Sequence, residues 1–309
     1  MKDCFICLNG QLIDNDNNDH IDRRKSLKGS WNLLKCNSCG AESIYPRPTL
    51  NELAEYYSIY YKNSSIEIKQ GIGSRFDFFR QAYHFFTGDV DPRNFIKKDP
   101  NKLMLDYGYG GATFLKYFHD KGCNIIGAEV SDDAILAGKK AGLNVKKIEH
   151  FDKIPFENSK FDIVYLMQVF EHLSDPRVFL SELNRILKVD GELYLGLPNH
   201  NSFWKNIFKR DWVNWFPPFH VAHYSVDSIK KISSDFGFEV EESWSKTPES
   251  WFRFSLKARY YNNNDLENSN TIIDRQPLKL IIMLFLKIIS IFIREHDCMI
   301  VKLKKINHD

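Results

Sequence analysis

The chain has 309 residues, with 42 basic and 40 acidic side chains and a formal net charge of +2. This balance gives no general attraction to nucleic acid, and a hydrophobic content of 43% is enough for a sizeable core. Six cysteines in a chain of this length do not make a disulfide scaffold, and residues 1–5 lack the apolar core of a signal peptide. We therefore expect a cytoplasmic protein with one large domain and appendages.

Four of the cysteines form two Cys-x-x-Cys pairs, at Cys4, Cys7, Cys36 and Cys39. Each pair can present two thiolates to one tetrahedral ion, and two such pairs complete a closed structural zinc site. The alternative is four unrelated free thiols. A thioredoxin-like redox pair is disfavoured, because no βαβ pattern surrounds either pair. The spacing predicts a zinc-ribbon-like module over residues 1–48.

Residues 49–97 are rich in aromatic side chains and begin with a helix signal. Thr49 and Glu52 have the spacing of a capping box, which predicts a helix directly after the first module. The segment fits either a helical linker packed on the main domain or a lid over a substrate.

Residues 102–115 read as a buried strand, a glycine turn and a helix that Thr113 can cap. This order brings backbone N–H groups close to a nucleotide-like ligand. A dinucleotide fingerprint requires a third glycine at Thr113, and Asp106 at the strand end would repel a pyrophosphate. The carboxylate suits a cationic ligand instead, such as the sulfonium and ammonium of S-adenosylmethionine. A glycine turn that binds nothing is the alternative.

Further apolar runs predict six more strands with helices between them, at residues 124–130, 145–148, 160–168, 192–198, 237–244 and 298–303. Glu129 lies at the end of the first of these runs, where an acid can accept both ribose hydroxyls of a nucleoside. Glu171 and His172 follow the run at 160–168, within reach of a substrate, although they could simply cap the next helix. The loop at 201–224 gathers tryptophans, prolines and histidines, which suggests a substrate pocket.

An insertion at residues 245–297 precedes the last predicted strand and contains a strongly apolar segment, 278–293. This segment carries a narrow polar stripe with two lysines and is too short to span a bilayer comfortably. It could be buried in the fold, lie on a membrane surface or mediate a homodimer.

Four motifs in this order resemble those of class I S-adenosylmethionine-dependent methyltransferases. They are the Asp-x-Gly-x-Gly run from Asp106, Phe161-Asp-Ile-Val164, Phe170-Glu-His-Leu-Ser-Asp-Pro176 and the run from Arg185 through Gly191 to Leu-Pro-Asn199. The resemblance covers residues 98–244 and extends to the final strand. It implies an α/β, Rossmann-like sheet of seven strands in the order 3-2-1-4-5-7-6, with the seventh antiparallel, over residues 98–309.

The resemblance also implies the cofactor, S-adenosylmethionine, and the residues that bind it. These are Asp106, Tyr107, Gly108, Gly110, Glu129, Val130 and Gln168. No single side chain near residues 149–152 can be assigned to the adenine. Together with the zinc module, the domain resembles bacterial methyltransferases of cell-surface polysaccharide and small-molecule pathways, which implies a hydroxyl of a carbohydrate, nucleotide-sugar or other small molecule as acceptor.

Methyl transfer to a hydroxyl requires loss of its proton, and a histidine suits the role of general base because its pKa is near neutral. His172, His220 and His223 fall near the expected methyl end of the cofactor. We favour His220, which follows Pro217-Pro218, with His172 second. The alternative is that His220 only holds its loop in place.

Two other functions keep the same fold. Ala112 replaces a glycine of the motif, and a bulky Tyr109 could crowd the methionine end, which would leave a non-catalytic binding or scaffold protein. A zinc module that grips RNA would make the chain an RNA methyltransferase. Residues 1–48, however, hold a single basic cluster, at residues 23–25.

Overall fold

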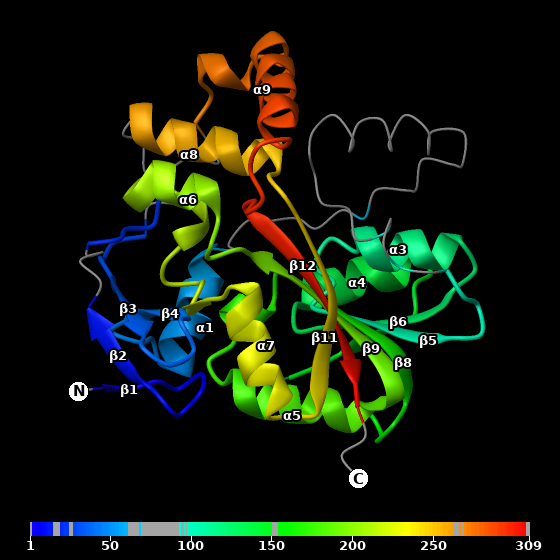
Figure 1. The fold of residues 1–309 in the computed structure, drawn as a ribbon. Coiled ribbons are helices and arrows are strands. Elements are labelled where there is room, and N and C mark those ends of the chain that lie inside the picture. The colour runs from blue at the N-terminus through cyan, green and yellow to red at the C-terminus, as the bar shows by residue number, and fades with distance from the viewer. Residues whose placement is uncertain are drawn as a thin grey trace.

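A computed structural model describes residues 2–14, 19–24, 27–60, 68, 93, 96, 98–149, 154–261, 266 and 269–306. Within these residues the strands form two sheets, one of seven strands and one of five (Figure 1). The five-stranded sheet lies beside the larger one, and a group of helices from the C-terminal half lies at one end of the molecule, next to the smaller sheet.

The seven-stranded sheet has the order β7-β6-β5-β8-β9-β12-β11. Strands β5 to β9 are parallel, whereas β12 pairs antiparallel with both β9 and β11. This arrangement confirms the predicted fold class and strand order. The strands are β5 (Leu103–Tyr107), β6 (Asn124–Glu129), β7 (Val145–Lys147), β8 (Phe161–Met167), β9 (Leu187–Pro198), β11 (Phe238–Lys246) and β12 (Cys298–Lys305).

Strand β9 begins earlier than the sequence predicts. Leu187 already pairs with Phe161 of β8, and the next residue of β9 in that ladder is Glu192. The residues between them, with Asp190 at a φ of 60°, bulge out of the register. The apolar pattern missed this part of the strand because Lys188, Asp190 and Gly191 interrupt the apolar run and because Val189 and Asp190 are exposed.

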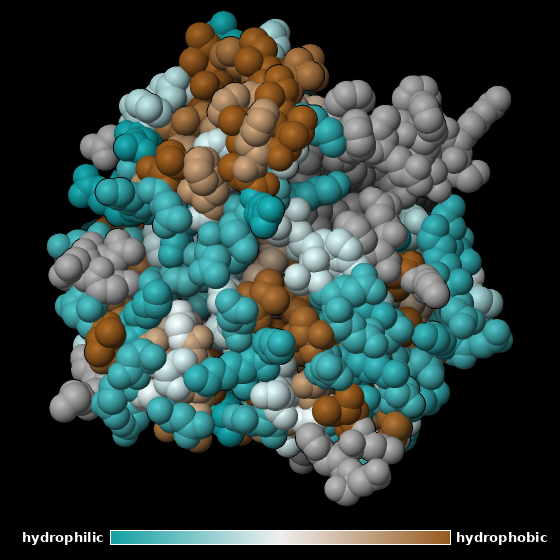
Figure 2. All heavy atoms as spheres, in the orientation of Figure 1, coloured by the Kyte–Doolittle hydropathy of each residue, from teal (hydrophilic) through white to brown (hydrophobic). Residues whose placement is uncertain are grey.

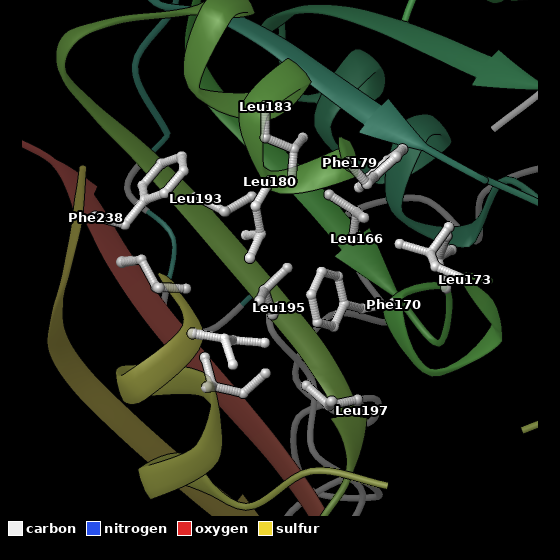
Figure 3. Close-up of a cluster of buried hydrophobic side chains, with 14 of the residues drawn as sticks. Leu166, Phe170, Leu173, Phe179, Leu180, Leu183, Leu193, Leu195, Leu197 and Phe238 are labelled. Carbon is white, nitrogen blue, oxygen red and sulfur yellow. The ribbon is translucent and has the colours of Figure 1, made fainter. Parts of the chain in front are cut away.

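Both faces of the large sheet are buried, which explains why its strands read as continuous apolar runs. Leu105 and Leu166 face a core closed by helices α5 (Pro176–Ile186) and α7 (Val226–Ser234). Figure 3 shows the α5 side chains meeting those of β8 and β9. The opposite core lies under α3 (Thr113–Asp120) and α4 (Asp132–Lys140).

The five-stranded sheet has the order β1-β2-β3-β4-β10. Four strands come from the start of the chain: β1 (Lys2–Asp3), β2 (Gln11–Asp14), β3 (Asn32–Cys36) and β4 (Glu42–Tyr45). The fifth, β10 (Ala222–His223), comes from the loop after β9 and pairs antiparallel with β4. The sheet therefore joins residues on both sides of the predicted boundary at residue 48. The domain boundaries themselves stay a prediction.

This smaller sheet is buried on both sides. Cys36 and Ala41 pack into the same core as α5 and α7. On the other side, Leu33 and Ile44 contact tryptophans and phenylalanines of the C-terminal half. The helices behind that second cluster are α6 (Phe203–Phe208), α8 (Glu249–Tyr261) and α9 (Gln276–Ile289).

Helix α1 (Leu50–Tyr60) begins at the predicted capping box, with Thr49 N donating to the Glu52 carboxylate at 2.7 Å and Glu52 N donating to Thr49 Oγ1 at 3.3 Å. The remainder of the predicted linker or lid, apart from positions 68, 93 and 96, lies outside the described residues.

The predicted insertion contains α8, a short 3-10 turn at Ile272–Asp274, and α9. Ile282 and Leu286 of α9 are buried and Ile289 packs partly against the same cluster, but Leu280, Ile281, Leu284, Phe285 and Ile288 are exposed. Burial in the fold therefore accounts for one side of the helix only. Over the described residues, no helix is both long enough and apolar enough to cross a bilayer.

Candidate active site

The side chain of Asp106, at the end of β5, supports the glycine turn between β5 and α3. This carboxylate is buried and accepts a hydrogen bond from Leu115 N at 3.0 Å. Burial, together with the nearby Glu129 charge, raises the pKa of Asp106 to about 7. Thr113 makes no capping hydrogen bond, contrary to the sequence expectation, because Asp106 takes that role and Ala112 precedes the helix at a φ of 55°.

The Tyr109 side chain points inward from the glycine turn, toward β6 and α4. Its hydroxyl donates to the Ala134 carbonyl at 2.8 Å, and its ring fills space beside two glycines. A Cβ added at Gly127 would lie 2.7 Å from the Tyr109 ring, and one added at Gly138 would lie 2.9 Å from its hydroxyl. The ring therefore does not crowd the methionine end, and the sequence-based objection to cofactor binding falls away.

Glu129 stands at the carboxyl end of β6 and gathers backbone N–H groups. One carboxylate oxygen accepts from Gly110 N at 2.9 Å, and the other accepts from Val130 N at 2.7 Å and Ser131 N at 3.2 Å. A Cβ added at Gly110 would meet no atom within 4 Å. The turn thus combines a fixed carboxylate with open space above it.

The other predicted cofactor residues lie on the same edge of the sheet. Tyr107 packs its ring against Phe179 in the core, so only its backbone can face a ligand. Gly108 has a φ of +72°, and a Cβ there would lie 2.6 Å from Val169. Gln168 adjoins this contact and donates through its side chain to the Gly196 carbonyl at 3.3 Å. The turn and the end of β8 are therefore neighbours.

A cavity of about 260 Å³ opens next to Gln168. Three of its lining residues, Gln168, His172 and His220, were predicted from the sequence. The sequence singled out none of the other five, although Phe216 and Phe219 lie in the loop predicted to form a pocket and Tyr57 lies in the predicted linker or lid; the five are Arg24, Tyr57, Phe216, Phe219 and Trp251. Aromaticity alone could not separate the four aromatic residues from core residues.

His172 and His220 lie edge to face, with ring centroids 4.8 Å apart. Nδ1 of His220 is 2.7 Å from the Asn214 carbonyl, and Nδ1 of His172 is 2.9 Å from the Phe219 carbonyl. Since a carbonyl can only accept, each Nδ1 carries the proton and each Nε2 keeps a lone pair. Burial lowers the pKa of His172 to about 4 and that of His220 well below its usual value. Both rings are therefore neutral near pH 7.

Glu171 lies behind the two histidines, with Oε1 at 3.9 Å from His220 Nε2. Within the described part of the chain neither carboxylate oxygen has a hydrogen-bond partner, and burial raises the pKa of Glu171 to about 8. Together with His172 and His220 this carboxylate could hold a metal ion. The positive charge of Arg24, which disfavours protonation of both rings, opposes a dication there.

The remaining candidates of the loop lie outside the cavity. His223 is fully buried against Trp215, with ring centroids 4.9 Å apart. The Trp212 indole donates to the Asp297 carboxylate at 2.8 Å. These side chains support the loop from behind, while the cavity walls are formed by other aromatic residues.

The four predicted zinc ligands come together at the end of the smaller sheet. All four are buried, and their sulfur atoms lie within 4.8 Å of one another. Cys4 Sγ is 3.9 Å from Cys39 Sγ, and Cys7 Sγ is 3.6 Å from Cys36 Sγ. Backbone N–H groups of Ser38 and Cys39 donate to Cys36 Sγ at 3.3 and 3.4 Å. A Cβ at Gly10 would lie 2.4 Å from Cys36 Sγ, so the site closes tightly.

Residues 78–243 match the family model of a methyltransferase domain. A protein of Mycolicibacterium smegmatis described as a probable S-adenosylmethionine-dependent methyltransferase is 28% identical over 165 residues, which cover 53% of this chain and 62% of that protein. A ubiquinone biosynthesis O-methyltransferase of Bartonella bacilliformis is 25% identical over 138 residues, covering 43% and 52%. The match to these relatives thus spans between half and two thirds of their length.

Among solved structures, the [4+2]-cyclase SpnF superposes with a TM-score of 0.50 at 17% identity, covering 85% of this chain and 98% of that one. At this identity the similarity concerns the fold alone.

Proposed function

The chain belongs to the methyltransferase-domain family, whose model spans more than half of it, and from this premise we propose that it transfers a methyl group from S-adenosylmethionine to a hydroxyl of a small molecule. The observation that carries the proposal is the adjacency of the glycine turn, where Gly108 abuts Val169, to the cavity lined by Gln168. A cofactor at the turn and an acceptor in the cavity would meet there.

The residues of the turn fit S-adenosylmethionine. A cation bound at the turn would favour the charged form of the buried Asp106, whose pKa is otherwise raised to about 7, and Glu129 is suited to accept hydrogen bonds from ribose hydroxyls. The backbones of Tyr107, Gly108 and Gly110 would line the site with Val130 and Gln168. When bound, the cofactor supplies an electrophilic methyl group on a sulfonium. The protein would contribute mainly by positioning the acceptor in line with it.

We propose His220 as the general base, with His172 second. Its Nδ1–H donates to Asn214, which leaves Nε2 free to accept the proton of the acceptor hydroxyl. The ring stays neutral, and thus able to accept, well below its usual pKa. A neutral imidazole can take up the proton that a hydroxyl acceptor must lose, as O-methylation requires. The aromatic walls around the cavity would keep water from the reacting atoms.

The acceptor class proposed here is a carbohydrate, a nucleotide-sugar or another small molecule of cell-surface or secondary metabolism. A cavity of about 260 Å³ suits a single ring better than an RNA strand. The methylation of ubiquinone precursors named for one relative also concerns small molecules. An RNA methyltransferase and a non-catalytic scaffold remain the alternatives for the tests below.

We further propose that Cys4, Cys7, Cys36 and Cys39 hold a structural zinc ion. In a tetrahedral zinc site the sulfur atoms lie about 3.8 Å apart, since each Zn–S bond is about 2.3 Å. The two short sulfur pairs, at 3.9 and 3.6 Å, fit that spacing. With four protein ligands the ion has no open position and would serve to fix the smaller sheet.

We also propose that α9 rests on an anionic membrane surface. Seven apolar side chains of residues 280–292 are 43% to 77% exposed: Leu280, Ile281, Leu284, Phe285, Ile288, Ile291 and Phe292. Figure 2 shows this apolar surface at one end of the molecule. Residues 275–294 include four basic residues and no acidic residue. The flanking Asp274 and Glu295 already bind Arg253 and Asn199.

Charge favours lipid over a second copy of the chain on this surface. A symmetric dimer through α9 would bring the four basic residues of 275–294 from each copy to one interface, where the like charges repel. Anionic lipid headgroups attract these basic residues, and each residue near the surface contributes about 1 kcal/mol to binding.

The cofactor proposal is tested by titrating S-adenosylmethionine calorimetrically. Wild-type protein is expected to bind with micromolar affinity, about −8 kcal/mol. Glu129→Ala should weaken binding by roughly 1.5–3 kcal/mol, because it removes hydrogen bonds to a charged group. Glu239→Ala, at an exposed position of β11, is the matched control and should bind like wild type. Equal affinity in both variants would exclude Glu129 from the site.

The base assignment is tested with His220→Ala, measured as S-adenosylhomocysteine release with an acceptor that the wild type methylates. Turnover should fall about a hundredfold or more while cofactor affinity is kept. The wild-type rate should hold through pH 6.5 and decline only in stronger acid, because the lowered pKa of His220 delays its protonation. His223→Ala, a buried histidine outside the cavity, should retain more activity. Near-normal turnover without His220 would shift the role to His172 or to positioning alone.

The metal proposal predicts one zinc ion per chain in gently purified protein, measured by elemental analysis. Cys36→Ser should lose the ion and lower the melting temperature, because it removes one of four ligands. Cys123→Ser changes a buried cysteine outside the cluster and should keep the ion. Wild-type protein without zinc would end the proposal.

The membrane proposal predicts that the protein sediments with phosphatidylglycerol vesicles and is released by high salt. Replacing Leu284 and Ile288 by Ser should abolish sedimentation, whereas Val178→Ser, an exposed apolar site on α5, should not. Protein that stays in the supernatant, or a dimer that the same pair of substitutions dissociates, would contradict it.

A further inference from the structure

Arg24 brings a permanent positive charge into the acceptor cavity from the N-terminal part of the chain. The described lining residues include Arg24 and two neutral histidines but no carboxylate. Arg24 lies over the Phe216 ring, with its guanidinium carbon 4.1 Å from the centroid. A cation at the wall of a small aromatic cavity acts directly on whatever enters it.

Among the described residues, the hydrogen-bonding capacity of Arg24 is largely unused. Within this part of the chain its Nε is buried without a hydrogen-bond partner, and its terminal N–H donates to Asn214 Oδ1 at 3.5 Å, the outer limit of a hydrogen bond. Among the described residues it makes no ion pair, whereas the adjacent Arg23 pairs with Asp211 at 3.1 Å. An arginine that is half enclosed and short of acceptors is suited to receive them from a ligand.

The described residues beside Arg24 are held by contacts within the fold. The Asp22 carboxylate accepts from Arg24 N at 2.8 Å and from Leu27 N at 3.0 Å. The Arg23 ion pair ties residues 22–24 to the segment after α6, and the Arg23 carbonyl accepts from Leu266 N at 3.2 Å. Since these contacts already hold the backbone of residues 22–24, placing Arg24 against a ligand costs little conformational entropy.

We propose that Arg24 selects acceptors that carry an oxyanion, a carboxylate or a phosphate, on a ring that fits between the aromatic walls. This inference rests on the proposed function and names its substrate class. A guanidinium matches planar oxyanions with two parallel hydrogen bonds, and Tyr57, Phe219 and Trp251 supply apolar faces for a ring. The same charge repels ammonium groups, so acceptors that are cationic amines are disfavoured.

The position of Arg24 also orders the acceptor. Arg24 and His220 line one cavity of about 260 Å³, so a single small molecule contacts both. With its oxyanion on Arg24, the acceptor presents the remainder of its ring toward His220 and Gln168. Arg24 is thus a specificity residue, and the methyl-transfer chemistry stays with the groups near the cofactor.

The test compares three probes with the same ring: benzoate, phenyl phosphate and benzyl alcohol. Each is titrated calorimetrically into full-length protein saturated with S-adenosylhomocysteine. Benzoate, phenyl phosphate or both should bind about tenfold or more tightly than benzyl alcohol. Preference for benzoate indicates a carboxylate acceptor, preference for phenyl phosphate indicates a phosphorylated one, and either result supports the proposal.

Arg24→Gln should reduce binding of the preferred anion by about tenfold or more, and Arg24→Lys should recover part of it. Arg210→Gln is the matched control, since it removes an exposed arginine that does not line the cavity, and it should keep the anion preference. The melting temperature and S-adenosylmethionine affinity of every variant should stay near wild type, which separates this test from that of the cofactor site.

Equal binding of benzyl alcohol and the anions would overturn the inference. Unchanged anion affinity in Arg24→Gln would do the same, and so would a wild-type protein that binds none of the anions. If S-adenosylmethionine itself fails to bind, the proposed function fails, while the probes still report on Arg24 in the protein alone.

Discussion

The pairing of β4 with β10 is the interaction on which the rest of the site depends. Ala222 and His223 pair with Ser43 and Glu42 across the smaller sheet, and Ile44 N donates to the Val221 carbonyl at 3.1 Å. Val221 N in turn donates to the Glu171 carbonyl at 2.9 Å. One line of backbone hydrogen bonds therefore runs from the N-terminal sheet through the loop of His220 to the end of β8.

This line explains why the acceptor cavity has walls from distant parts of the chain. The large sheet alone supplies the cofactor edge and Gln168, as its parallel strands all end there. The N-terminal segment adds Arg24 and Tyr57, and the insertion adds Trp251. A zinc ion in the cysteine cluster would hold the sheet that anchors this arrangement, without taking part in the chemistry. The cysteines share a core with α5 and α7, so the two sheets form one packed unit.

Much of the large sheet could be predicted from the sequence, because its strands are buried on both faces and its helices alternate with them. The glycine turn and Glu129 followed from the same pattern. The capping by Asp106 and the inward turn of Tyr109 could not be predicted, since both depend on contacts across the sheet, with Leu115 and with Ala134. Strand β10 is two residues long and pairs with β4, which is distant in the sequence, so no local sequence pattern predicts it. In the sequence, Arg24 could not be distinguished from a surface cation, because its place at the cavity also depends on distant parts of the chain.

The central claim is that the N-terminal sheet and the His220 loop form one cooperative unit. Hydrogen exchange of wild-type protein and Cys36→Ser, followed by mass spectrometry, tests it most directly. The account predicts faster exchange in the variant at both β4 and residues 219–224, with β5 and β6 as protected as in the wild type. Faster exchange confined to residues 2–45, with the His220 loop unchanged, would contradict it.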